Sequence, residues 1–139
     1  MARHFTQHIT RSTAILSLST PMDQGSWTPN TDVYETPEFL IVKMELAGIR
    51  KEDVEITMQD RLLIVRGYRQ DNCPHRRGRC SFRQMEIDYG YFERRILMPA
   101  LVDAGLAQAH FHNGILHVEL PKTSHSVPSA VTVVIEQIS

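Results

Sequence analysis

The sequence predicts an all-β protein, an antiparallel β-sandwich, from three observations. Short runs of alternating apolar and polar residues recur from residue 30 onward, with turn residues about every ten positions. Asn113-Gly114 lies between two such runs, and this pair is a strong hairpin signal because both residues tolerate positive φ. Helical periodicity has little support after residue 30.

Four strands are predicted in the first half of this region. Residues 32–36 form a short strand that Pro37 ends, because proline cannot donate to a ladder. Residues 54–58 alternate, and the four apolar residues in a row at 62–65 indicate a strand covered on both faces. In 39–46 one face is apolar: Leu40, Val42, Met44 and Leu46.

The second half begins with a polar loop over residues 69–79, followed by extended chain over 80–86. Residues 91–99 form the next predicted strand, and Pro121 ends the second arm of the hairpin. A β-branched run, 131–135, lies near the end of the chain. The inward faces of the hairpin arms are Ala107, Ala109 and Phe111, then Leu116, Val118 and Leu120.

Composition indicates one globular domain with a net charge close to zero. The 139 residues are 42% hydrophobic with a formal net charge of −1, which provides no electrostatic reason to expect nucleic acid or a membrane surface as partner. No apolar run approaches the roughly eighteen residues that span a bilayer. Two cysteines, Cys73 and Cys80, do not make a disulfide framework, so we expect a reducing compartment, the cytoplasm.

The N-terminal residues 1–29 are interpreted as a flexible arm. Their Ser, Thr and Arg content, with no acidic residue before Asp23, also fits a transit peptide, and this alternative stays open.

Short motifs follow one another in a fixed order between residues 27 and 122. They are 27–29 (WTP), 32–36 (DVYET), 45–54 (ELAGIRKEDV), 62–67 (LLIVRG), 89–94 (YGYFER), 98–99 (MP) and 109–122 (AHFHNGILHVELPK). With these motifs the chain resembles the small heat-shock proteins, chaperones built on the α-crystallin domain. It departs from the family pattern at Ala47, where proline is usual, and at Ile96 and Met98, which replace an aromatic residue and a leucine.

The resemblance implies an immunoglobulin-like sandwich, the α-crystallin domain, over 30–122, preceded by the flexible arm 1–29 and followed by a C-terminal extension, 123–139. It also implies a dimer in which each chain lends its neighbour the strand near 79–86. The residues of that exchange strand are Cys80, Phe82, Met85 and Glu86.

The family's Ile-x-Ile tail motif appears here as Val131-x-Val133 or Val133-x-Ile135, so two registers are open. The resemblance implies that this tail docks into an apolar groove on another subunit and builds a larger homo-oligomer. The predicted groove residues are Val54, Ile56, Met58, Leu106 and Phe111.

The function implied is that of a holdase, which binds unfolding proteins without ATP and prevents their aggregation. We expect the groove and the apolar residues of the arm to bind clients; the latter are Phe5, Ile9, Ile15, Leu16 and Leu18. The alternative in a different class is an adaptor of the related CS-type cochaperone fold, which binds a folded partner. The sequence contains no nucleotide-binding loop and no recognisable nucleophile motif, so we expect neither an enzyme nor a cofactor.

Arg94 lies between Phe92 and Ile96 on a face that otherwise buries. A buried guanidinium needs a carboxylate, and Glu86 and Asp88 are candidates. The alternative is an edge position, with the charged group reaching water.

Two groups of residues raise the question of a metal. We interpret His110, His112 and His117 as an outward-facing solvated set rather than a zinc site, since no thiol or carboxylate is close in sequence. Cys73, His75 and Cys80 share a loop without a second cysteine pair, which argues against structural zinc. An enzyme that uses a metal at the histidines is the third alternative.

A basic patch in the same loop is interpreted as a solvated surface rather than a nucleic-acid site. Its members are Arg76, Arg77 and Arg79, and Arg69 lies further back in the same loop.

Overall fold

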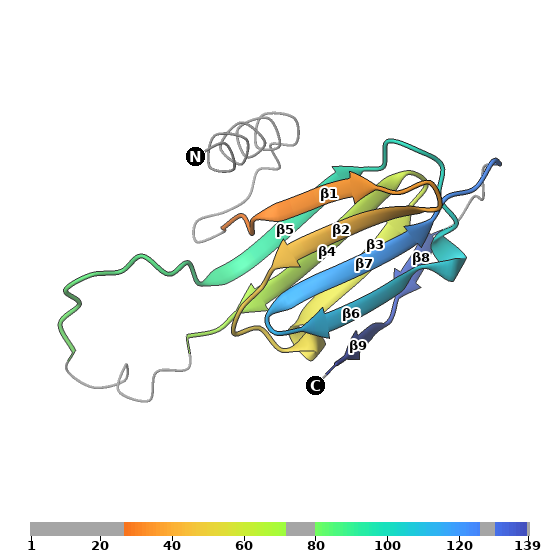
Figure 1. Ribbon diagram of the computed structural model, residues 1–139. Helices are drawn as coiled ribbons and strands as arrows, with labels where there is room; N and C mark the ends of the chain where they lie inside the picture. The colour runs from red at the N-terminus through yellow and green to blue at the C-terminus, as the bar shows by residue number, and fades with distance from the viewer. Residues whose placement is uncertain (1–26, 72–79, 126–129, 139) are drawn as a thin grey trace.

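The computed structural model describes residues 27–71, 80–125 and 130–138. Two β-sheets pack face to face (Figure 1). The five-stranded sheet has the order β1 (Thr31–Glu35), β2 (Phe39–Glu45), β7 (Ile115–Pro121), β6 (Gln108–His112) and β9 (Ile135–Gln137). The four-stranded sheet has the order β5 (Gly90–Leu97), β4 (Leu62–Arg69), β3 (Val54–Gln59) and β8 (Ala130–Val133). Two single-turn 3₁₀ helices, η1 (Lys51–Asp53) and η2 (Ala104–Leu106), complete the described structure.

All neighbouring strands are antiparallel except β6 and β9, which are parallel. The predicted antiparallel sandwich is therefore confirmed.

The core lies between the sheets and is built from alternate residues of each strand, as the sequence predicts. The inward residues of β2 and β7 are at most 1% exposed: Leu40, Val42, Met44, Leu116, Val118 and Leu120. They pack against the inward residues of the other sheet, which include Ile56, Met58, Leu63, Val65 and Phe92. Strand β4 is covered on both faces, because Ile64 points away from this core and is still only 4% exposed.

The turn between β6 and β7 has the positive φ values expected of Asn-Gly, 48° at Asn113 and 78° at Gly114. It also fixes the end of β2, because the amide of Leu46 donates to the carbonyl of Gly114 at 2.8 Å. A Cβ atom at position 114 would lie 3.2 Å from the Cα of Ala47. Two features therefore favour glycine at position 114: the positive φ of its backbone and the short distance to Ala47.

The expected extended segment 80–86 forms no strand in this single chain. Residues 80–89 run away from the sandwich (Figure 1), and Phe82 and Met85 are more than half exposed. A strand needs a ladder partner, and residues 80–86 pair with no strand of either sheet of their own chain among the described residues.

Arg69 is also placed differently from the prediction. It is the last residue of β4 rather than part of the solvated loop.

We predict that Gly114→Val destabilises the fold by about 1–3 kcal/mol, because a β-branched residue is strained at positive φ. The free energy of unfolding in urea measures this. The control is Gly105→Ala in η2, where a Cβ would approach the Asp103 side chain at 3.3 Å and the φ is ordinary. Unchanged stability in Gly114→Val would contradict the requirement for glycine.

Candidate functional site

The candidate site is the groove between β3 and β6, where the edges of the two sheets come together. The C-terminal tail fills it, because β8 pairs antiparallel with β3 and β9 pairs parallel with β6 of the same chain. One short segment thus extends both sheets. In Figure 1 the two tail strands lie beside β3 and β6, at the C-terminal end of the colour scale.

The tail places its apolar side chains on the core. Val133 lies opposite Ile56 and is 6% exposed, whereas Val131 lies opposite Met58 and is partly buried against the core. The chain crosses from one sheet to the other at Val134, which is 79% exposed. Ile135, opposite Ala109, again packs against the core. The pairs Val131-x-Val133 and Val133-x-Ile135 therefore both place their side chains against the core in this arrangement.

Polar contacts hold the end of the tail. The amide of Ile138 and the side-chain amide of Gln137 both donate to the carbonyl of Phe111, each at 3.0 Å. Glu136 lies beside His110, with 3.7 Å between Oε2 and Nδ1.

The tail contact is weak in energetic terms. Burial of one aliphatic side chain contributes about 1.5–3 kcal/mol. Ordering each immobilised side chain costs about 0.5–1.5 kcal/mol, and ordering the backbone costs more. Because only a few side chains are buried, a docked tail of this size can dissociate and dock again.

Most of the predicted groove residues are brought together. Ile56, Met58 and Phe111 are buried beside the tail, and Val54 is 9% exposed at the start of β3. Leu106 differs: it lies on η2 and is 62% exposed, because the 3₁₀ turn points its side chain away from the groove.

On the opposite side of the sandwich, β1 and β5 are the outermost strands of their sheets among the described residues. Strand β1 has no neighbour on its outer side within the described residues, and Val33 is 42% exposed although it lies opposite the core residue Val42. Arg94 lies on this side, on the edge strand β5. It is half-buried and donates to the carbonyl of Pro29 at 3.3 Å.

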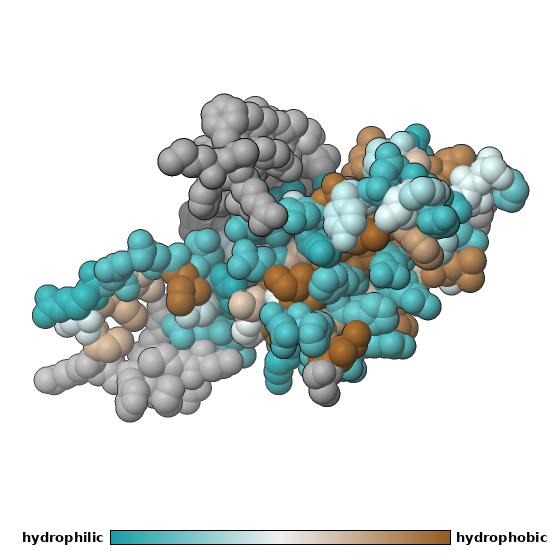
Figure 2. All heavy atoms as spheres, in the orientation of Figure 1, coloured by the Kyte–Doolittle hydropathy of each residue, from teal (hydrophilic) through white to brown (hydrophobic). Residues whose placement is uncertain are grey.

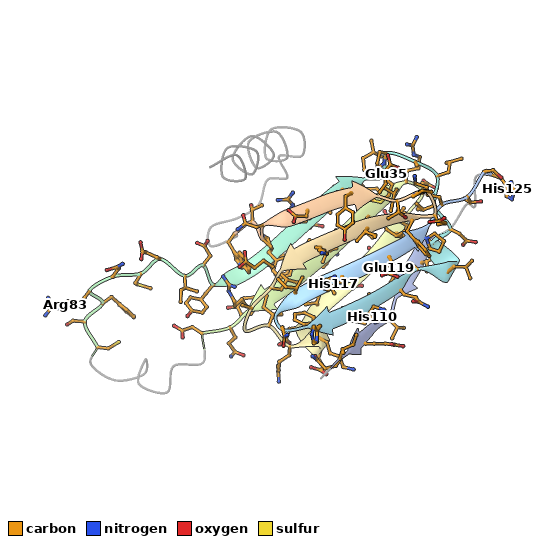
Figure 3. All side chains as sticks on the ribbon, viewed as in Figure 1. Glu35, Arg83, His110, His117, Glu119 and His125 are labelled. Carbon is orange, nitrogen blue, oxygen red and sulfur yellow. The ribbon has the colours of Figure 1, made fainter. Side chains whose placement is uncertain are left out.

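Residues 80–86, the predicted exchange strand, precede β5 in the chain. Cys80, Phe82, Met85 and Glu86 are all exposed. Figure 3 shows Arg83 of this segment far from both sheets.

A row of titratable side chains crosses the outer face of the five-stranded sheet. The register aligns, one per strand, Asp32, Lys43, His117, His110 and Glu136. Figure 3 shows the two histidines on neighbouring strands, and Figure 2 shows that this face is mostly hydrophilic. Among the described residues no group of three or more His, Cys, Asp or Glu side chains is arranged to hold a metal ion.

Partial burial lowers the pKa of His117, and the positive charge of Lys43 lowers it further. His112 and His110 act in the same direction, whereas Glu119 raises this pKa.

No helix in the described part of the chain is long and apolar enough to cross a membrane.

Comparison with known proteins identifies the family and supports the fold. The model of the Hsp20/alpha crystallin family matches residues 32–136, which include the sandwich and the tail strands. The chain belongs to this family.

Relatives of this small heat-shock protein include heat shock protein 16 of Schizosaccharomyces pombe, 34% identical over 102 residues, which are 73% of this chain and 71% of that protein. Small heat shock protein C2 of Rickettsia felis is 32% identical over 94 residues, 68% of this chain. The match spans 60% of that relative's length.

Solved structures agree. Heat shock protein 16.0 from Schizosaccharomyces pombe matches with a TM-score of 0.65 and 33% identity, over 74% of this chain and 94% of that chain. A small heat-shock protein from Xylella fastidiosa, described as having a distinct high order structure, matches with a TM-score of 0.63 and 29% identity, over 77% of this chain and 96% of that chain.

Several residues singled out from the sequence of this small heat-shock protein lie outside the described part. These are Phe5, Ile9, Ile15, Leu16 and Leu18 of the arm, and Cys73, His75, Arg76, Arg77 and Arg79 of the loop.

The lowered pKa of His117 predicts a pH effect on this small heat-shock protein. Its ordinary pKa is 6.5, so as the pH falls through that range the unfolded chain takes up this proton before the folded chain does, and stability falls. His117→Gln should therefore lose less thermal stability than the wild type between about pH 7.5 and about pH 5.5.

The matched control is His125→Gln, because His125 is exposed in the segment that follows β7 (Figure 3). An equal drop in melting temperature for His117→Gln and the wild type would contradict the assignment.

Proposed function

We propose that this protein is an ATP-independent holdase, a non-enzymatic chaperone that binds unfolding proteins under stress and prevents their aggregation. The observation that carries the proposal is the apolar groove filled by a short, weakly held tail. When the tail leaves, apolar side chains of the core and the edges of β3 and β6 become accessible. Unfolding chains offer both of the things that such a surface binds, apolar side chains and unpaired backbone.

Assembly follows from the same contacts made between chains. We infer that the tail 123–139 also docks on another subunit, in the groove that its own tail occupies here. Many weak contacts of this kind hold an oligomer together while each one still exchanges. The three-part division into arm, domain and extension belongs to this proposal, as does a cytoplasmic location.

The dimer is proposed to form at the open side of the sandwich. The exchange segment of one chain, Cys80 to Glu86, adds to the outer edge of β1 of its neighbour, which is unpaired among the described residues, since an exposed edge accepts a further strand. Arg94 lies on this open side and contributes charge to that interface. The arm residues Phe5 to Leu18 supply further apolar contacts to clients.

The test is aggregation of a heat-sensitive model client, followed by light scattering without ATP, together with the mass of the protein in solution. We expect an oligomer and suppressed scattering. A client that precipitates equally fast with and without the protein would contradict the proposal, and a monomer in solution would favour the adaptor.

A matched pair of variants links this activity to the tail. Val133→Asp places a carboxylate at a 6% exposed position and should release the tail, whereas Val134→Asp places it at a 79% exposed position and should not. We expect smaller assemblies for Val133→Asp alone. Equal oligomer mass for the two variants would contradict docking through Val133.

A further inference from the structure

Three segments distant in sequence meet at the end of the sandwich from which the exchange segment departs. They are the chain before β1, the turn after β2 and the chain before β5, and they surround a cleft of about 610 Å³. Its lining includes Trp27, Ala47, Asp88 and Tyr89. One side chain in this cleft, that of Arg69 at the end of β4, contacts all three segments.

The contacts of Arg69 are specific to a guanidinium. Its Nε donates to the carbonyl of Asp88 at 2.7 Å, and Nη1 donates to the carbonyl of Ala47 at 3.2 Å. Its Cζ lies 3.9 Å from the centre of the Trp27 ring and 5.9 Å from that of Tyr89. A planar group with several donors in fixed directions can bond two carbonyls and stack on a ring together, which the single ammonium of lysine cannot do.

Trp27 is itself fixed to the start of β5. Its indole Nε1 donates to the carbonyl of Gly90 at 3.0 Å, and its amide donates to the carbonyl of Tyr91 at 3.1 Å. Its ring packs edge-on against Phe92, with 5.4 Å between ring centres. Arg69 and Trp27 therefore hold the chain that leads from the exchange segment into β5, Arg69 at Asp88 and Trp27 at Gly90.

We propose that Arg69 is the positioning residue for strand exchange: it sets the direction in which residues 80–89 leave the domain. This rests on the proposed strand-exchange dimer. The exchange segment reaches far from the sandwich (Figure 3), so a small rotation at its base displaces its tip by a much larger distance. If the exchange segment already leaves the domain in one direction, it loses less conformational entropy when it binds the neighbouring chain. Arg69 also links two parts of the chain, because it contacts Trp27, which follows the N-terminal arm, and Asp88, which follows the exchange segment.

The test uses Arg69→Lys and Arg69→Met in the full chain. Arg61→Met is the matched control, because Arg61 donates Nη2 to the carbonyl of Met98 at 2.8 Å just before the opposite end of β4. That variant loses an arginine–carbonyl bond without touching Trp27 or the exchange segment. Native mass spectrometry on dilution gives the dimer dissociation constant. We expect a rise of about tenfold or more for both Arg69 variants and a change within about twofold for Arg61→Met.

Orientation is measured separately, by energy transfer from Trp27, the single tryptophan of the chain, to a dye on Cys80 in a Cys73→Ser background. We expect a narrow distance distribution in the parent and in Arg61→Met, and a broad one in both Arg69 variants. Equally narrow distributions would overturn the proposal, as would equal weakening of the dimer by Arg61→Met. A parent protein that is monomeric at every concentration would refute strand exchange itself, while the distance distribution would still decide whether Arg69 orients the segment.

Discussion

Backbone N–H and C=O groups at the edge of a sheet need partners, and the architecture of this protein depends on how they are supplied. On one side of the sandwich a single tail satisfies two edges, β3 through β8 and β6 through β9. On the other side Trp27 bonds one end of β5, while β1 has no outer neighbour within the described residues. The two sides therefore differ in character: one is closed by a removable segment, and the other is open to a further strand.

This difference accounts for the two kinds of assembly in the proposal. A tail that buries few aliphatic side chains binds reversibly, and its departure exposes core residues such as Ile56 and Phe111. Strand exchange at β1 would add residues 80–86 of another chain and requires that segment to leave its own domain in the right direction. The contacts of Arg69 with Asp88, Ala47 and Trp27 meet that requirement within one chain.

Local patterns were sufficient for most of the fold. Alternation identified the buried faces of β2 and β7, the four apolar residues from Leu62 identified a strand covered on both faces, and Asn113-Gly114 identified its turn. What the sequence could not predict depends on contacts between distant segments. The split of the tail between two sheets and the row from Lys43 to Glu136 follow from strand pairing, which no local spacing encodes.

Arg69 illustrates the same limit. Followed by polar residues, it has the sequence context of a solvated loop, yet its partners are contributed by three other segments. Leu106 was expected in the groove because it is apolar, but the turn of η2 directs it to solvent. Leaving single apolar residues exposed is common, so hydrophobicity alone does not predict a groove wall.

The most direct test of the central claim is hydrogen exchange of backbone amides in the full chain and in a chain that ends at Lys122. The account predicts faster exchange in the shortened chain at β3 and β6, with β7 unchanged because its neighbours on both sides remain. Equal protection of β3 and β6 in the two proteins would contradict the claim that the tail covers these edges.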